Sequence, residues 1–138
     1  MLRVLVMDDE ETVRFLAGEA LAVLGCEAVM AEDGSAALVL YRQALAAGRP
    51  FDLVIMDLTV PQGGMGGEEA VRRLLLIDPQ ARVIVSSGYA QDPAMVNYAE
   101  YGFCGALAKP YSLQKLAGVL REFIPAFPGR VDSPVPGD

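Results

Sequence analysis

The sequence predicts an α/β fold: a doubly wound, five-stranded parallel sheet with helices on both of its faces. Short apolar segments alternate five times with longer amphipathic segments, which is typical of parallel strands joined by right-handed crossovers. The short segments lack polar alternation, as expected of strands that are buried on both faces. With 138 residues, 53% of them hydrophobic and 21% charged, the chain has the composition of one compact soluble domain.

Each strand is predicted from a brief apolar run, most of these runs being rich in Val, Leu or Ile. Each helix is predicted from apolar residues that recur every three or four positions. The predicted strands are residues 2–7, 27–31, 51–56, 81–86 and 105–108. The predicted helices are residues 11–24, 35–47, 68–77, 93–101 and 112–123.

The residues between these segments favour the same boundaries. Gly25, Gly48 and Gly102 lie where helix C-termini favour glycine, and Ser35 and Ser112 can cap the helices that follow them. We expect one domain over residues 1–124. Residues 125–138 contain four prolines and two glycines and little to bury, so we expect a C-terminal tail or linker there.

Charge and composition exclude several classes of function. Eighteen acidic and eleven basic residues give a formal net charge of -7, which repels nucleic-acid phosphates, and we expect no nucleic-acid partner. The absence of histidine excludes an imidazole general base, a Ser/His/Asp triad and a histidine metal ligand. Carboxylate, hydroxyl and lysine chemistry remain.

The cysteines and the hydropathy pattern indicate a location. Cys26 and Cys104 both lie in apolar surroundings, and the sequence shows no charged-then-apolar leader and no apolar run near 18 residues. We expect a reduced, cytoplasmic protein with no membrane span.

Reactive side chains follow four of the five predicted strands. In an open parallel sheet, ligands bind outside the carboxyl ends of the strands, where the strand order reverses. Strand two is followed only by Glu32 and Asp33. The other four strands are followed by Asp8, Asp9 and Glu10, by Asp57, by Ser86 and Ser87, and by Lys109 and Pro110.

This convergence predicts phosphoryl chemistry. Three crowded carboxylates repel one another unless a cation lies among them, and oxygen ligands suit Mg²⁺ better than zinc. Asp57, which follows the apolar run LVIM, is the candidate nucleophile, and Lys109 with a serine hydroxyl can stabilise charge on the phosphoryl oxygens. Taken alone, the acidic run at residues 8–11 is equally consistent with a solvated loop before a helix N-terminus.

Four segments resemble the receiver domain of two-component response regulators, in order and at the family's spacing. They are VLVMDDE at 4–10, DLVIMDLTVP at 52–61, VIVSSG at 83–88 and AKP at 108–110. The resemblance spans residues 2 to about 124 and implies a flavodoxin-like strand order of 2-1-3-4-5. It also implies a phosphoryl acceptor that catalyses its own Asp phosphorylation and dephosphorylation, and not an enzyme with other substrates.

The resemblance implies a role for each residue at the site. Asp57 would take a phosphoryl group from a histidine kinase or histidine phosphotransfer domain. Mg²⁺ would be held by Asp9, Asp57 and the backbone carbonyl of Thr59, with Asp8 acting through metal-bound water. Ser87 matches the switch hydroxyl, and the Lys109–Pro110 bond would be cis.

Finer features set this chain apart within the family. The glycine-rich turn at residues 63–67, the Gly88-Tyr89 pair and the proline-rich exit most resemble receivers at the C-terminus of hybrid sensor histidine kinases. Three positions before Lys109 the family usually has an aromatic residue, whereas this chain has Ala106. The usual coupling of hydroxyl movement to an aromatic rotamer flip therefore cannot operate here.

A partner face is predicted near the fourth helix, fifth strand and fifth helix. Tyr89, Tyr98, Tyr101 and Tyr111 cluster in this part of the sequence. They favour either homodimer or effector docking, or packing at the sheet edge.

Three other functions share parts of the pattern. A phosphatase of the haloacid dehalogenase type needs a second Asp two positions after the nucleophile, where this chain has Thr59. A flavodoxin-like flavin carrier shares the fold class, but the acidic pocket would repel a flavin phosphate. A receiver-like interaction module that is not phosphorylated in use stays open as the alternative, because of Ala106.

Overall fold

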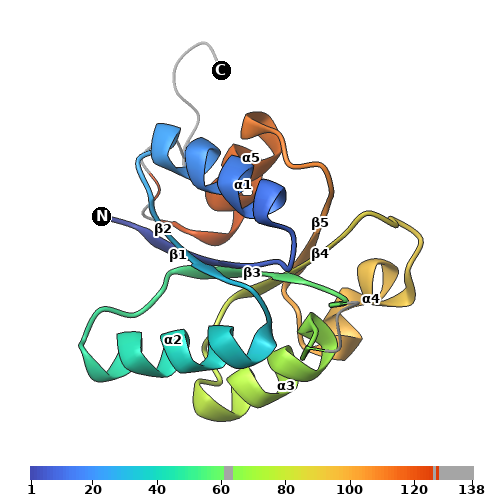
Figure 1. Cartoon of the computed structure of the whole chain (residues 1–138), viewed down its shortest axis with the longest axis horizontal. Coiled ribbons are helices and arrows are strands. Elements are labelled where there is room, and N and C mark those ends of the chain that lie inside the picture. The colour runs from blue at the N-terminus through green and yellow to red at the C-terminus, as the bar shows by residue number, and fades with distance from the viewer. Residues whose placement is uncertain (61–63, 126, 128–138) are drawn as a thin grey trace.

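A computed structural model describes residues 1–60, 64–125 and 127, and it confirms the predicted α/β architecture (Figure 1). All strand pairs are parallel, and the strand order is β2-β1-β3-β4-β5. The strands are β1 (Arg3–Met7), β2 (Glu27–Ala31), β3 (Leu53–Asp57), β4 (Val83–Ser87) and β5 (Gly105–Ala108).

Helices cover both faces of the sheet. The helices are α1 (Glu11–Val23), α2 (Gly34–Ala46), α3 (Gly67–Ile77), α4 (Pro93–Val96) and α5 (Leu113–Phe123), with a 3₁₀ helix η1 at Tyr98–Tyr101. In Figure 1, α1 and α5 lie on one side of the sheet, and α2, α3 and α4 lie on the other. None of the described helices combines the length and apolar character that a membrane span requires.

Two apolar clusters, one on each side of the sheet, hold these layers together. Along β1, Val4 and Val6 belong to the cluster that includes residues of α1 and α5, whereas Leu5 and Met7 belong to the cluster on the α2 and α3 side. All four side chains are fully buried. Because both faces of the strand are covered, apolar residues occupy successive positions, and this explains the missing polar alternation.

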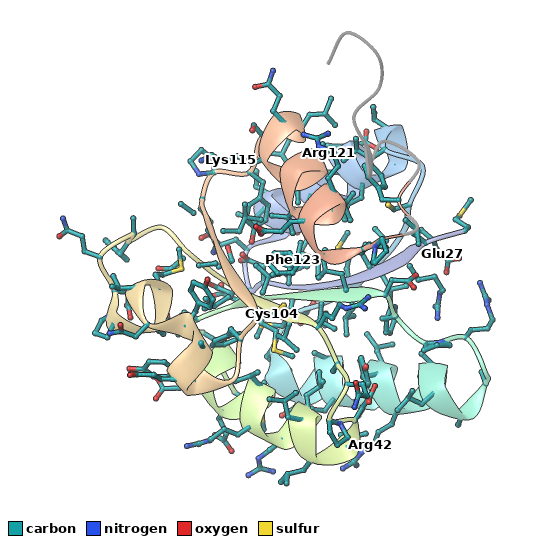
Figure 2. The ribbon with its side chains drawn as sticks, turned by 180° about the vertical axis from the view of Figure 1, so that it is seen from behind. Glu27, Arg42, Cys104, Lys115, Arg121 and Phe123 are labelled. Carbon is teal, nitrogen blue, oxygen red and sulfur yellow. The ribbon has the colours of Figure 1, made fainter. Side chains whose placement is uncertain are left out.

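Close packing of α5 depends on the small first residue of β5. Phe123 lies between α5 and the sheet (Figure 2), and a Cβ atom on Gly105 would come within 2.8 Å of its ring. A side chain at Gly105 would therefore push α5 away from the strand that leads to the rim.

The amino-terminal edge of the sheet carries balanced charges. Glu27, at the start of β2 (Figure 2), lies 3.2 Å from the Arg3 guanidinium and 3.0 Å from that of Arg49. The Arg3 guanidinium also stacks 4.5 Å from the centre of the Phe51 ring. Every charge named here thus has an opposite charge or an aromatic ring beside it.

Two strands end one residue later than predicted, and the difference bears on the rim. The ladder includes Asp57 as the last residue of β3 and Ser87 as the last residue of β4. Asp57 pairs with Ser86, and Ser87 pairs with Ala108. The backbone positions of Asp57 and Ser87 are therefore set by the sheet and not by a loop.

One predicted helix cap is wrong and one is confirmed. The helix α2 begins at Gly34, so its N-cap is Asp33, whose carboxylate accepts a hydrogen bond of 2.9 Å from the backbone N–H of Ala36. Ser35 lies inside the first turn and does not cap it. Ser112 caps α5 as predicted, accepting a 3.0 Å hydrogen bond from Lys115 N–H.

The fourth predicted helix is interrupted. Instead of one helix over residues 93–101, α4 ends at Val96 and η1 begins at Tyr98, with Asn97 at φ -113° and ψ 45° between them. In a 3₁₀ helix residues three apart lie on the same side. Tyr98 and Tyr101 thus both pack against the cluster on the α3 side, which an α-helix would not align as closely.

The predicted tail at residues 125–138 lies for the most part outside the described residues. Phe127 is described, and its side chain is buried in the cluster with residues of α1 and α5. Both cysteines are free thiols, Cys26 buried and Cys104 half-buried. The predicted boundary at residue 124 stays a prediction.

Replacing Gly67 should destabilise the junction between β3 and α3. A Cβ atom at Gly67 would lie 2.6 Å from the backbone carbonyl oxygen of Asp57, too close for van der Waals contact. We expect Gly67→Ala to lower the free energy of unfolding by about 1–3 kcal/mol, the usual cost of overpacking. Urea unfolding followed by circular dichroism measures this change.

The matched control is Gly118→Ala in α5. A Cβ atom at Gly118 meets no other atom within 4 Å, so this variant should be about 0.5–1 kcal/mol more stable than the parent chain, because alanine favours helix interiors. Equal losses of stability in the two variants would contradict the proposed clash.

Candidate functional site

The predicted site residues meet in a cavity at the carboxyl ends of the strands. This edge lies on the side of α4 in Figure 1. The cavity has a volume of about 410 Å³ and is lined by residues that end or follow β1, β3, β4 and β5, namely Asp9, Glu10, Asp57, Thr59, Ser87, Gly88, Tyr89 and Lys109. Strand β2 contributes no lining residue, in agreement with the sequence analysis.

Lys109 stands between two carboxylates. Its Nζ atom lies 3.0 Å from Asp57 Oδ1, to which it donates a hydrogen bond, and 2.7 Å from Asp8 Oδ2. The Lys109 side chain is only 15% exposed, and that of Asp8 is fully buried. Burial by itself would lower the pKa of Lys109, but its close contacts with the charged Asp8 and Asp57 raise it above its ordinary value.

Asp8 is held from two directions. Its Oδ1 atom accepts a 2.9 Å hydrogen bond from the backbone N–H of Glu10. Its Oδ2 atom is buried and accepts no well-aligned hydrogen bond, so the ion pair with Lys109 is its partner. The Arg14 guanidinium donates to the Asp8 backbone carbonyl at 2.8 Å, which fixes the turn into α1.

Asp57 is difficult to ionise in this environment. Burial is the main cause, followed by the charge of Asp8, and together they raise the pKa of Asp57 to about 7 although Lys109 acts in the opposite direction. A hydrogen bond with Asp9 is the smallest contribution to this raised value. Three carboxylates therefore share one ammonium group, and the site carries an excess of negative charge.

This donor set fits a hard divalent cation. Carboxylate oxygens of Asp8, Asp9 and Glu10 lie within 4.8 Å of one another, and Asp9, Asp57 and Thr59 line the same cavity. All these donors are oxygen atoms, which Mg²⁺ prefers, and its charge would offset the excess of carboxylates. The sequence analysis expected Glu10 at the carboxyl ends of the strands but gave it no role as a metal ligand. The structure places its carboxylate in the acidic cluster with Asp8 and Asp9.

Ser87 and Tyr89 form the opposite wall of the cavity. Ser87 is nearly buried, and its Oγ atom accepts a 3.0 Å hydrogen bond from the backbone N–H of Tyr89. The hydroxyl can still donate its own proton into the cavity. The Tyr89 side chain is 78% exposed and stands at the mouth.

The two remaining predicted positions lie beside the cavity. The Lys109–Pro110 peptide bond is cis, as the family resemblance implies. Ala106 lies in β5 among the apolar residues on the α3 and α4 side, where Tyr98 and Tyr101 from η1 pack against the same cluster. The aromatic side chains of this region thus come from η1 and from Phe103, which precedes β5, and not from β5 itself.

Tyr111 has a place that the sequence analysis missed. The sequence grouped it with Tyr89, Tyr98 and Tyr101 as either a docking face or sheet-edge packing, but its hydroxyl points inward and donates a 2.5 Å hydrogen bond to Ser86 Oγ, which is fully buried. Burial raises the pKa of Tyr111 to about 12, so the phenol keeps its proton. The alternation of side chains along β4 sends Ser86 and Ser87 to opposite faces, and this was the signal available in the sequence.

Of the four tyrosines grouped as a docking face, Tyr89 alone is exposed. Tyr98 and Tyr101 are half-buried against the core, and Tyr111 bonds to β4. Their arrangement favours packing at the sheet edge over a continuous aromatic surface.

Comparisons with known proteins agree with this geometry. The profile of the family described as "Response regulator receiver domain" matches residues 4–121. Sporulation initiation phosphotransferase F of Bacillus subtilis is 28% identical over 123 residues, which cover 89% of this chain and 94% of that protein. Sensor kinase CckA of Brucella abortus is 32% identical over 121 residues, which cover 88% of this chain but 12% of that protein.

A solved structure extends the similarity to three dimensions. The response regulator protein TrrA of Thermotoga maritima, in complex with Mg²⁺ and BeF, is 27% identical to this chain. It superposes with a TM-score of 0.74 and covers 90% of this chain and 100% of the other.

Removing the Asp57 charge should stabilise the metal-free protein at alkaline pH. The pKa of Asp57 is about 7 in the folded chain, against its ordinary value of 3.8. Between these values the folded state binds more protons than the unfolded state, so Asp57 makes stability fall as the pH rises from about 4 to about 7. Asp57→Asn has no carboxyl group to ionise at this position, so its stability does not fall with pH for this reason.

We therefore expect Asp57→Asn, with divalent ions chelated, to have a higher urea midpoint than the parent chain at about pH 8 and a similar one at about pH 4. Glu19→Gln, which neutralises an exposed carboxylate of α1, should keep the pH profile of the parent. Parallel profiles for Asp57→Asn and the parent chain would contradict the assigned shift.

Proposed function

Because the chain belongs to the response regulator receiver domain family, we propose that it takes a phosphoryl group from a histidine kinase or histidine phosphotransfer domain onto Asp57. The observation that carries this proposal is the contact between Lys109 Nζ and Asp57 Oδ1, 3.0 Å, at the floor of an acidic cavity. It puts a carboxylate nucleophile and a phosphate-binding cation side by side.

The proposed reaction is a direct transfer between two side chains. Lys109 donates to Oδ1 of Asp57, and a carboxylate oxygen of Asp57 forms a bond to phosphorus as the bond between phosphorus and the donor's histidine nitrogen breaks. Lys109 and the Ser87 hydroxyl then neutralise charge on the phosphoryl oxygens. The fully buried Asp8 keeps the ammonium of Lys109 in place during the transfer.

Mg²⁺ is the cofactor that the site's oxygen donors support. We assign its ligands to Asp9, Asp57 and the Thr59 carbonyl, with Asp8 acting through a bound water, and Glu10 lies close enough to add to the acidic field. When bound, the ion supplies positive charge to the phosphoryl oxygens and lowers the repulsion between the carboxylates.

The phosphorylation signal is assigned to the loop after β4. Ser87 Oγ accepts a hydrogen bond from Tyr89 N–H, so a movement of Ser87 toward a phosphoryl group would act on the backbone of Tyr89. Ala106 has no ring to move. We place the switched face for effector docking, or for a homodimer, at α4, β5 and α5, which follow this loop.

The setting of the domain is also a proposal. The similarity to Brucella abortus sensor kinase CckA supports a receiver of the hybrid histidine kinase type. The free thiols of Cys26 and Cys104 support a reduced, cytoplasmic compartment. We propose residues 1–124 as the receiver domain.

The alternative function is a receiver-like interaction module that is not phosphorylated in use. Ala106 favours it, because the family's usual aromatic switch is missing. The two functions differ in whether Asp57 is chemically competent.

Asp57 should be the phosphorylated residue. Incubation with Mg²⁺ and acetyl phosphate should add one phosphoryl group, stable in acid and labile in base, and intact-mass spectrometry measures it. Asp57→Asn should fold normally and take no label, because the amide is nearly isosteric but cannot act as the nucleophile. Labelling of Asp57→Asn at the level of the parent chain would exclude Asp57, and an unlabelled parent chain would favour the interaction module.

Mg²⁺ should stabilise the unphosphorylated domain through Asp9. Adding Mg²⁺ should raise the melting temperature, because the ion binds the folded state and relieves repulsion among the carboxylates. Asp9→Ala loses a ligand and part of the repulsion, so it should be insensitive to Mg²⁺ and more stable than the parent without metal. Glu19→Ala, a change on the exposed side of α1, should respond like the parent chain. An undiminished response in Asp9→Ala would remove it from the ligand set.

A further inference from the structure

We propose that Tyr111 is a positioning residue for Lys109, acting through the hydrogen bond between its hydroxyl and the Ser86 hydroxyl. This bond joins the segment that follows Lys109 to the strand beside Asp57. The kinetic consequence rests on the proposed function, whereas the effect on the Lys109 ammonium does not.

The hydrogen bond links the segment after Lys109 to β4, the strand next to Asp57. The Tyr111 hydroxyl donates to Ser86 Oγ at 2.5 Å. Ser86 is the strand partner of Asp57, and its backbone carbonyl accepts a 2.8 Å hydrogen bond from Leu58 N–H. Tyr111 is therefore fastened to the residue that sets the backbone of β3 at and after Asp57.

The chain after Lys109 has few other attachments to the sheet. Lys109 N–H donates to the Ser87 carbonyl at 2.9 Å, which is the last ladder bond of β5. Pro110 has no N–H to donate, and α5 begins only after its N-cap at Ser112. Within the described residues, the Tyr111 hydroxyl thus makes the one hydrogen bond between the 110–111 segment and the sheet.

The Lys109 ammonium group can move little without losing a contact. Its Nζ atom must stay 3.0 Å from Asp57 and 2.7 Å from Asp8 at once. A displacement of about 1 Å breaks one of these contacts, and errors of this size in a reacting group slow reactions by as much as about a hundredfold. A hydrogen bond two residues after Lys109 restricts such a displacement.

The hydroxyl, and not the ring, makes the link. The Tyr111 ring packs against the apolar cluster shared by α1 and α5, and a phenylalanine ring keeps that packing. Tyr111→Phe consequently removes the bond to Ser86 and leaves the apolar contacts in place.

The competing explanation is that the Tyr111–Ser86 hydrogen bond only stabilises the fold, since buried polar groups need partners wherever they occur. The chain offers a matched control for it. The Tyr41 hydroxyl donates a 2.6 Å hydrogen bond to Asp78 Oδ2, and the Tyr41 side chain is almost fully buried between α2 and the sheet. Tyr41→Phe removes the same chemical group at a place remote from Lys109.

The first measurement uses the lysine ammonium groups themselves. The sequence has two lysines, Lys109 and Lys115, so selective ¹⁵N-lysine labelling gives two side-chain signals in a nuclear magnetic resonance spectrum. Lys115 lies on the outside of α5 (Figure 2), where its ammonium group makes only a long 3.5 Å hydrogen bond to the Pro110 carbonyl, and its signal in the parent chain provides the exposed reference. In Tyr111→Phe we expect the Lys109 signal to move toward that of Lys115 and its hydrogen exchange with water to quicken about tenfold, whereas Tyr41→Phe leaves it unchanged.

The second measurement is the rate of labelling by acetyl phosphate with Mg²⁺. Tyr111→Phe and Ser86→Ala should each be about tenfold slower than the parent chain, about 1.4 kcal/mol of barrier. The double variant should be no slower than either single variant, because both remove the same bond. Tyr41→Phe should label at the parental rate.

The melting temperatures of the variants distinguish a positioning role of the Tyr111 hydroxyl from a role in which it only supplies a partner to a buried polar group. Each single variant leaves one buried hydroxyl without a partner, and the double variant removes both, so its melting temperature should recover toward the parental value. A positioning role keeps the labelling rate of this stable double variant low. Recovery of the rate together with stability would overturn the proposal.

An unchanged Lys109 signal in Tyr111→Phe would also overturn it. A parent chain that takes no label would overturn the proposed function, and the lysine spectra of Tyr111→Phe and Tyr41→Phe would still decide whether Tyr111 positions Lys109.

Discussion

The Lys109 ammonium group is the centre of the molecule's charge arrangement, because it lies within ion-pair distance of both Asp8 and Asp57. These carboxylates end two neighbouring strands, and the sheet cannot bring the strands together without bringing the charges together. Burial and then the charge of Asp8 raise the pKa of Asp57, and the excess of carboxylates over one ammonium group leaves the cavity attractive to a divalent ion. The opposite edge of the sheet differs, since Arg3 and Arg49 there share Glu27. The excess of carboxylates described here thus lies at the carboxyl ends of the strands.

Much of this arrangement could be predicted from the sequence, for a simple geometric reason. Runs without a polar residue, such as residues 53–56, fit only a strand that is covered on both faces of the sheet. Once the strands are parallel, whatever follows them lies along one edge, so Asp9, Asp57, Ser87 and Lys109 had to meet. The exact ends were less predictable, because a ladder extends or stops by one residue for small differences in free energy.

Features that depend on side-chain reach across elements could not be predicted in this way. The bond from Tyr111 to Ser86 depends on the reach of the tyrosine side chain from the segment after β5 to β4, and such reach leaves no periodic pattern in the sequence. The cap at Asp33 and the break at Asn97 arise from a one-residue shift and from packing of Tyr98 and Tyr101. The adjacent serines at the end of β4 differ in this respect, because alternation along the strand already predicts that they face opposite sides; the structure shows Ser86 bonded to Tyr111 and Ser87 lining the cavity.

The shortness of α4 has an energetic consequence. Four residues form a single turn, which is too short to be stable on its own, since helix nucleation is unfavourable. Its structure is held by the burial of Ala94 and Met95, while Val96 stays 60% exposed. Because so few buried contacts hold this segment, we expect it to open locally at a lower free energy than global unfolding. A change of a few contacts in the region between the cavity and β5 would then redistribute the population among backbone conformers.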